Sequence, residues 1–163
     1  MNLVPIKNYE NFYSFDLNNN QVYGHIRKKY RKPYLHKTGY YEINLCKNSK
    51  IKAFKFHRLI YEAHYGSIPD KMFIDHIDNN KQNNNIENLR LATNSQNKMN
   101  TKTYKNNLSG YKNISKTKWN TYKVEITINN KTVYQKNFKT LEEAIENRDI
   151  KLKEFHEEFC NLG

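Results

Sequence analysis

Cysteines, acidic residues and long apolar runs are scarce in this chain of 163 residues. Its two cysteines, Cys46 and Cys160, are far apart and form no CxxC pair, which argues against a disulfide framework and against a structural zinc site. No segment is long and apolar enough to cross a membrane, and residues 1–10 do not resemble a signal peptide. We therefore expect a cytoplasmic protein with no membrane partner and no structural zinc.

The shortage of acidic residues gives the chain a strong positive charge. Lys and Arg number 28 against 16 Asp and Glu, for a net charge of +12. The charge is uneven, because residues 21–58 hold eleven Lys and Arg with one acid, Glu42, and residues 101–138 hold eight Lys with one acid, Glu125. Such a field attracts polyanions, so we expect salt-sensitive binding to nucleic acid. The plainer alternative is that the lysines only keep the protein in solution.

The apolar share is low at 37%, yet 13 Tyr and 8 Phe indicate small packed cores rather than disorder. We expect residues 1–50 to form a module of short strands, followed by a helix over residues 56–64 that ends before Gly66 and Pro69. The expected strands of this module lie at 12–15, 22–26 and 40–45, with turns at 18–20 and 47–49.

Residues 51–100 are expected to form a compact ββα unit. A strand at 72–75 and a partner at 89–92 flank an Asn-rich loop, and a helix over 95–99 follows an N-cap at Thr93 or Asn94. This arrangement puts His76 at the end of the first strand, Asn88 at the exit of the loop and Asn97 on the helix.

After a linker at residues 101–108, we expect a C-terminal module over residues 109–163. Its strands are expected at 111–115, 122–128 and 132–138, with a turn at 129–130. A capping box of Thr140 and Glu143 should start a helix whose apolar stripe, from Leu141 to Phe155, rests on the sheet. The predicted fold class is α+β: N-terminal strands, a central ββα unit, and a three-stranded antiparallel sheet packed on one helix.

The ββα unit has the residue types that phosphodiester hydrolysis needs. Asp75 offers a carboxylate and Asn97 an amide oxygen, which suit one hard divalent ion such as Mg²⁺ or Mn²⁺. His76 is the candidate general base, and the side-chain oxygen of Asn88 is the candidate group that orients it. Taken singly, each of these residues is more often structural. Asp78 could also approach the ion, but its place beside Asn79 and Asn80 favours a role in ordering the loop. The joint spacing inside a basic chain is what favours a site.

These residues resemble the HNH endonuclease family, specifically its phage and intron-associated homing type. The resemblance rests on four segments, 56–59, 74–78, 85–89 and Asn97. It implies Asp75 and Asn97 as metal ligands, His76 as base and Asn88 as its orienter, in a bacterial or phage-infected cell. Asn97 stands where the family name would place a third His, which leaves the metal preference open. His57 is carried over only as part of the scaffold of the motif.

The flanking modules resemble DNA-binding motifs that accompany these nucleases. Residues 5–13 and 24–27 resemble a small N-terminal motif, and residues 109–144 resemble the ethylene-response-factor type of domain, whose sheet lies in the major groove. Because this sheet has no Arg, we expect it to grip phosphates more than it reads bases. The candidate DNA contacts are Lys112, Lys116, Lys118, Trp119, Lys123, Lys131 and Lys136 in this sheet, with Arg27, Arg31 and Arg58 nearer the N-terminus.

The sequence thus favours a metal-dependent, site-preferring endonuclease that acts on double-stranded DNA as a monomer and nicks it. One alternative is a DNA-binding protein in which the HNH unit is only a scaffold. Another is an RNA-binding protein whose Tyr-rich basic strands stack bases.

Overall fold

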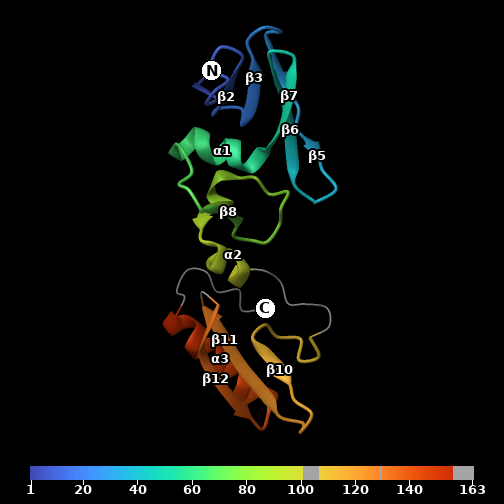
Figure 1. Ribbon diagram of the computed structural model, residues 1–163, viewed down its shortest axis with the longest axis vertical. Helices are drawn as coiled ribbons and strands as arrows, with labels where there is room; N and C mark the ends of the chain where they lie inside the picture. Colours follow the sequence, from blue (N-terminus) through green and yellow to red (C-terminus); the bar gives the residue numbers. More distant parts are fainter. Residues whose placement is uncertain (101–106, 129, 156–163) are drawn as a thin grey trace. The chain divides into compact units, whose positions relative to one another are not determined.

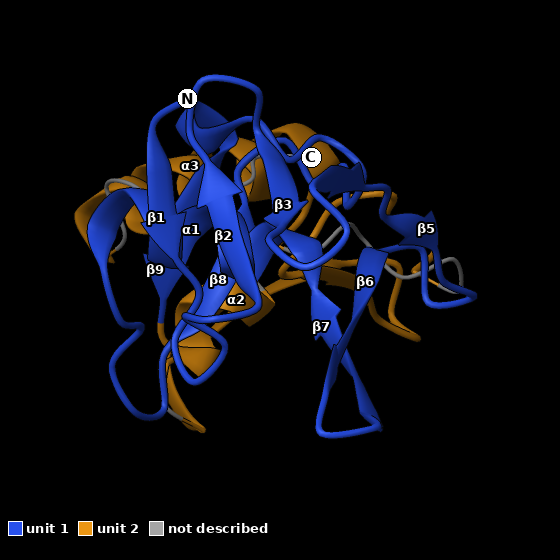
Figure 2. Ribbon diagram, turned by 90° about the horizontal axis from the view of Figure 1, so that it is seen from above, with its two compact units in different colours: residues 1–92 blue, residues 93–163 orange. Residues whose placement is uncertain are grey.

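A computed structural model of the protein describes residues 1–100, 107–128 and 130–155, and the chain divides into two compact units. The first unit comprises Met1–Ala92 and the second Thr93–Gly163, and Figure 2 colours them separately. Both units combine short antiparallel strands with helices, which confirms the predicted α+β class (Figure 1). Residues 101–106 of the predicted linker lie outside the described residues, and the four predicted domain ranges stay predictions.

The first unit begins with a four-stranded antiparallel sheet in the order β1-β2-β3-β4. Two of these four strands were predicted from the sequence. The other two have only three residues each and were missed, because a strand that short shows no clear alternation. The strands are β1 (Leu3–Pro5), β2 (Tyr13–Asp16), β3 (Gln21–Gly24) and β4 (Lys29–Arg31).

A buried carboxylate holds this sheet together. Asp16 accepts hydrogen bonds from the Tyr30 hydroxyl at 2.6 Å, the Asn19 side-chain amide at 2.8 Å and the Asn18 backbone amide at 3.1 Å. The hydrogen bond from Tyr30, followed by that from Asn19, lowers the pKa of Asp16 to about 2. The carboxylate therefore stays charged across the physiological range and ties β2 to β4.

The second sheet has the order β5-β6-β7 and contains a long hairpin. Its strands are β5 (Tyr34–Leu35), β6 (Tyr41–Lys47) and β7 (Lys50–Lys55). The hairpin turns at Asn48 and Ser49, whose φ values of 50° and 61° fit a two-residue turn with both central residues left-handed. The sequence prediction missed β7, because Phe54 and Phe56 were assigned to the start of a helical pattern.

Asparagine supplies most of the left-handed backbone positions in the structure. Of the ten non-glycine residues with positive φ among the described residues, seven are Asn. These are Asn8, Asn20, Asn48, Asn79, Asn113, Asn120 and Asn130. Asn tolerates this conformation better than most residues, so the Asn-rich segments are turns rather than disordered stretches.

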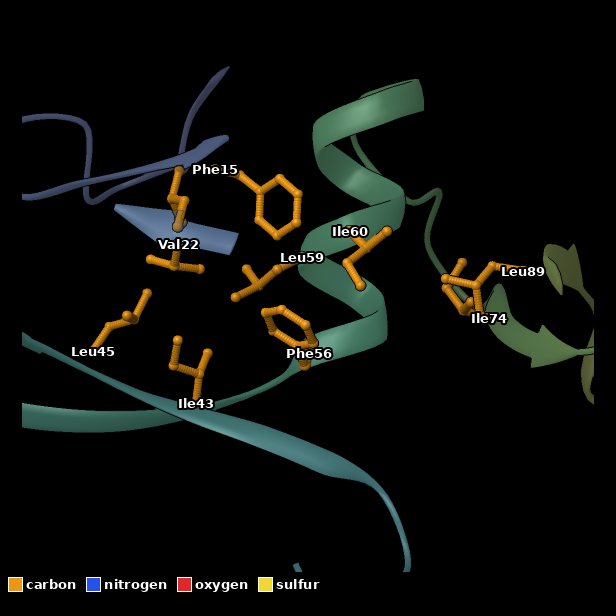
Figure 3. Packing of buried hydrophobic residues seen from close by; sticks show 10 residues of the cluster. Phe15, Val22, Ile43, Leu45, Phe56, Leu59, Ile60, Ile74 and Leu89 are labelled. Atoms are coloured by element: carbon orange, nitrogen blue, oxygen red, sulfur yellow. The ribbon is translucent and has the colours of Figure 1, made fainter. Parts of the chain in front are cut away.

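Helix α1 (Phe56–Tyr65) lies at the centre of the first unit. Figure 3 shows Phe56 and Leu59 facing the residues of the two N-terminal sheets, while Ile60 lies towards Ile74 and Leu89 on the other side. The predicted helix over 56–64 is confirmed, and it ends at Gly66, whose φ is 86°. One hydrophobic core therefore joins the N-terminal strands to the hairpin that follows α1.

That hairpin and the helix after it match the predicted ββα unit. The elements are β8 (Phe73–His76), the short 3₁₀ helix η1 (Ile86–Asn88), β9 (Leu89–Ala92) and α2 (Asn94–Asn100). Thr93 caps α2, because its hydroxyl accepts from the Gln96 amide at 3.3 Å while its own amide donates to the Gln96 side chain at 2.8 Å. Helix α2 belongs to the second unit, and the hairpin to the first.

The rest of the second unit is a three-stranded antiparallel sheet with one helix. Its elements are β10 (Ile114–Lys116), β11 (Tyr122–Ile128), β12 (Lys131–Phe138) and α3 (Leu141–Phe155). The predicted capping box is confirmed, since the Glu143 amide donates to the Thr140 hydroxyl at 3.2 Å and the Thr140 amide to the Glu143 carboxylate at 3.4 Å. No helix in the part of the chain that the structure describes is long and apolar enough to cross a bilayer.

The buried face of α3 differs from the predicted stripe at two positions. Ala144 and Leu152 are buried as expected, but Phe155 is 40% exposed. Arg148 is only 1% exposed, and its guanidinium donates to the Lys112 carbonyl at 3.3 Å and lies 5.5 Å from the Tyr111 ring. A buried Arg cannot be found from an apolar pattern, because it is stabilised by polar partners, here the Asp149 carboxylate next to it and the Lys112 carbonyl in a distant turn.

The two units have separate hydrophobic cores, which makes their stabilities separable. Ile60 is completely buried in the first core and Ile126 is 2% exposed in the second. We predict that Ile60→Ala and Ile126→Ala each cost about 2–5 kcal/mol, the usual range for such a cavity. Hydrogen exchange followed by mass spectrometry should show faster exchange in residues 1–92 for the first variant and in residues 93–155 for the second. Equal acceleration in both units for either variant would contradict the separation.

Candidate active site in the hairpin of the first unit

Asp75 and His76 are neighbours in β8, so their side chains point to opposite faces of the hairpin. Both are buried, with exposures of 5% and 4%. The antiparallel register puts Asp75 opposite Arg90 and His76 opposite Leu89. One strand therefore supplies a carboxylate on one face and an imidazole on the other.

The carboxylate of Asp75 has a cationic partner that sequence reasoning missed. Arg90 Nε lies 3.0 Å from Asp75 Oδ2, and the two side chains are 19% and 6% exposed. In an ion pair this buried, each charge depends on the other, since removing one side chain leaves the other charge buried and uncompensated. The guanidinium therefore balances the charge of the Asp75 carboxylate inside the fold.

The imidazole of His76 is oriented by an amide. Its Nε2 donates to the side-chain oxygen of Asn84 at 3.0 Å. An oxygen that only accepts selects the tautomer with the proton on Nε2, which leaves the lone pair on Nδ1. The kind of contact is the one predicted for Asn88, but the residue that makes it is Asn84, four positions earlier.

Asn88 instead closes the loop between the strands. Its side-chain oxygen accepts from the Asp78 amide at 3.1 Å, and its Nδ2 donates to Asp78 Oδ1 at 2.9 Å and to the Asn83 carbonyl at 2.8 Å. Although burial raises the pKa of Asp78, hydrogen bonds from Asn83, the Asn80 amide and Asn88 outweigh it and lower that pKa. This hydrogen-bonded loop also carries Asn84, so Asn88 influences His76 through the path of the loop.

A second histidine packs against the candidate base. The rings of His57 and His76 lie 5.1 Å apart at 64°, and His57 is 6% exposed. Its Nδ1 is buried without a hydrogen-bond partner. Burial, and then the nearby charges of His76, Arg58 and Lys55, lower the pKa of His57 to about 3. His57 is therefore neutral at ordinary pH, and its ring packs directly against that of His76.

Tyr40 completes a cluster of three rings. Its centroid lies 5.1 Å from that of His57 and 5.9 Å from that of His76, with both pairs tilted. Tyr40 directly precedes β6, so it comes from a different sheet from His76. No local sequence pattern indicates this contact, because it depends on how α1 packs between the β5-β6-β7 sheet and the β8–β9 hairpin.

Asn97 lies in α2 at the start of the second unit, where it is half-buried. Its pairing with Asp75 as a metal ligand stays a prediction. Among the described residues no group of three or more His, Cys, Asp and Glu forms a metal site. A site of one carboxylate and one amide would nevertheless suit a hard ion such as Mg²⁺ or Mn²⁺ that keeps several waters.

The predicted DNA contacts of the second unit lie on different faces of its sheet. Lys136 is opposite the buried Val124, and Lys116 is opposite Tyr122, which also packs against the core. Opposed residues share a face, so these two lysines lie on the side of α3. Lys123, one residue before Val124, lies on the other side and pairs with Glu125. The open face of the sheet therefore carries fewer lysines than predicted.

The turns of the second unit expose other predicted contacts. Trp119 is 73% exposed between β10 and β11, with Lys118 Nζ 4.6 Å from its ring centroid. Lys131 is exposed at the start of β12, and Lys112 Nζ donates to the Lys98 carbonyl at 2.7 Å. An exposed aromatic with a cation beside it is a feature of nucleic-acid contacts.

The predicted arginine contacts of the first unit lie on two elements. Arg27 and Arg31 line a hollow of about 500 Å³ between the first sheet and the β6–β7 hairpin. Ile26 and Ile51, both largely exposed, line the same hollow. Arg58 is half-buried on α1, one residue after His57.

Burial of His57 predicts a specific pH dependence of stability. Below the ordinary His pKa of 6.5, His57 is protonated in the unfolded chain. In the folded protein the same side chain stays neutral down to about pH 3. Stability should thus fall as the pH drops from about 6.5 towards 3, by about 2 kcal/mol at about pH 5. In His57→Phe the loss of unfolding free energy between about pH 7.5 and pH 5 should shrink by that amount, measured by denaturant titration. An identical loss in both proteins would show that His57 is protonated in the fold.

Comparison with known proteins agrees with the geometry. A model of the HNH endonuclease family matches residues 54–99. An uncharacterized HNH endonuclease of Acanthamoeba polyphaga mimivirus is 37% identical over 139 residues, which are 83% of this chain and 67% of that protein. The DNA endonuclease I-HmuI of Bacillus phage SP01 is 37% identical over 93 residues, or 57% of this chain and 53% of that one.

A solved structure of I-HmuI, described as DNA binding and cleavage by an HNH homing endonuclease, matches with a TM-score of 0.50. It has 37% sequence identity and covers 57% of this chain and 53% of its own. The chain thus spans about two thirds of the mimivirus relative and about half of I-HmuI. On the identity and coverage of the mimivirus relative, together with the match over the hairpin and α2, this chain belongs to the HNH endonuclease family.

Proposed function

We propose that the protein is a metal-dependent endonuclease that hydrolyses phosphodiester bonds in duplex DNA, with His76 as the general base. The observation that carries the proposal is the fixed, buried imidazole of His76 beside Asp75 on the strand that the HNH family match includes. An imidazole held in one orientation by an amide oxygen is suited to take a proton from an attacking water. Membership of the family and the likeness to I-HmuI support DNA as the substrate.

His76 would remove a proton from the attacking water at Nδ1. Asn84 holds the opposite nitrogen, and Asn88 supports the loop that carries Asn84. The neutral rings of His57 and Tyr40 limit where the imidazole can move, so its orientation costs little at the moment of reaction. Asn88 would therefore act on the base indirectly, as a positioning residue.

Asp75 and Asn97 would hold one divalent ion, Mg²⁺ or Mn²⁺. When bound, such an ion neutralises charge on the phosphate and assists the leaving oxygen. The ion pair with Arg90 holds the Asp75 carboxylate in one place on its face of the hairpin. Two protein ligands leave coordination positions for phosphate oxygens and water. These ligands therefore suit an ion that also binds the substrate.

The basic charge would bind the DNA on either side of the cut. The net charge of +12 supports this, as do the exposed Trp119 with Lys118 in one unit and Arg27 in the other. A single HNH centre acting as a monomer would nick one strand at each binding event. The second candidate, a DNA-binding protein with an inactive scaffold, lacks a supporting observation, since Asp75, His76 and Asn97 are all present.

The first test is cleavage of supercoiled plasmid with Mg²⁺ or Mn²⁺, comparing the natural protein with His76→Ala. The natural protein should give open circles that disappear with chelator, whereas His76→Ala should lose cleavage by about 10²–10⁴-fold, the usual contribution of a general base. DNA binding by gel shift should be close to unchanged in the variant. Equal loss of cleavage and binding would make His76 structural.

The second test concerns the metal ligand on α2. Asn97→Ala should raise the metal concentration needed for half-maximal cleavage, because an oxygen ligand is lost. Asn94→Ala, on the same helix and outside the proposed ligand set, is the matched control and should leave that concentration unchanged. A metal titration of Asn97→Ala that overlays the natural one would remove Asn97 from the ligand set.

A further inference from the structure

A basic feature lies beside His76 that neither the motif nor the predicted DNA contacts include. The ring of Tyr40 has Lys55 Nζ at 4.9 Å and Lys81 Nζ at 4.7 Å from its centroid. Lys55 ends β7, and Lys81 lies in the loop after β8. Three segments far apart in sequence thus meet on one ring, and we call these three residues the Tyr40 cluster.

The turn that carries Tyr40 is held in place. The His36 amide donates to the Tyr40 carbonyl at 2.9 Å, and Gly39, with φ of 83°, donates to the His36 carbonyl at 2.8 Å. Lys81 Nζ donates to the Thr38 carbonyl at 3.3 Å. The turn is therefore a fixed platform, and the ammonium of Lys81 has a defined place on it.

The two lysines of the cluster differ in electrostatic role. Lys55 Nζ lies 2.6 Å from Glu42, and this hydrogen bond is the main cause that lowers the pKa of Glu42. The charge of Lys55 is thus compensated inside the fold. Lys81 is exposed and its partner is a neutral carbonyl, and in the described ranges no carboxylate forms an ion pair with it. Its charge remains available to an anion from solution.

We propose that the Tyr40 cluster is a subsite for a backbone phosphate of DNA, bound by the Lys81 ammonium, which seats the strand against His76. The proposal rests on the proposed endonuclease function. The ring distances place Lys81 Nζ within about 11 Å of the His76 ring. A DNA strand carries one phosphate for about every 3.4 Å of helix axis, so a phosphate near the reacting one lies within this reach.

The competing explanation is that Lys81 only clamps the turn. A clamp needs a hydrogen-bond donor to the Thr38 carbonyl, whereas a phosphate subsite needs the positive charge. Lys81→Gln keeps a donor and removes the charge, and Lys81→Arg keeps both. Lys71→Gln is the matched control, since Lys71 is exposed in the turn before β8, at the end of that strand away from His76, and is not among the predicted DNA contacts.

The experiment measures binding of the full chain to a short mixed-sequence DNA duplex, with chelator, across a range of salt concentrations. In Lys81→Gln the slope of log K against log salt should fall in magnitude by about 0.9, the value for one lost phosphate contact. Lys81→Arg and Lys71→Gln should keep the slope of the natural protein. Thermal melting of all variants checks the fold.

An unchanged slope in Lys81→Gln would overturn the subsite while leaving the endonuclease proposal intact, because binding and cleavage are measured separately. Equal loss of slope in Lys81→Gln and Lys71→Gln would also overturn it, since any exposed lysine would then contribute equally to binding. If the natural protein shows no salt-dependent binding to DNA at all, the proposed function fails, and the subsite fails with it.

Discussion

The packing of α1 on two sides is the constraint on which the first unit depends. Phe56 and Leu59 face the N-terminal sheets, and Ile60 lies towards Ile74 in the β8–β9 hairpin (Figure 3). A helix buried in this way fixes both neighbours at once, because a close-packed core does not deform continuously. His57 sits in the first turn of the same helix, so the contact that holds the His76 ring follows from the hydrophobic core.

The two faces of β8 have opposite electrostatic character. Asp75 meets the guanidinium of Arg90, whereas His76 meets an amide and two uncharged rings. Adjacent residues of a strand face opposite ways, so the Asp75 carboxylate and the His76 imidazole lie on different faces of the hairpin.

Local signals predicted much of the fold from the sequence. The Thr93 and Thr140 caps and the Asn-rich turns each depend on residues a few positions apart. The contacts around His76 were not predictable in the same way. Which asparagine of the loop contacts His76, Asn84 or Asn88, depends on the path of a loop that holds several such side chains. The contact between Tyr40 and His76 depends on packing between sheets. The same holds for the buried Arg148, which donates to a carbonyl 36 residues away in addition to its ion pair with Asp149.

The left-handed asparagines described above also affect the unfolded chain. The sequence has only five glycines, and Asn performs the turn conformations that glycine usually takes. Glycine loses more backbone entropy on folding than any other residue, so a turn built on Asn starts from a less disordered unfolded state. For two units with small cores and many short strands, this saving recurs at seven turns. Scarcity of glycine thus lowers the backbone entropy that this chain loses on folding.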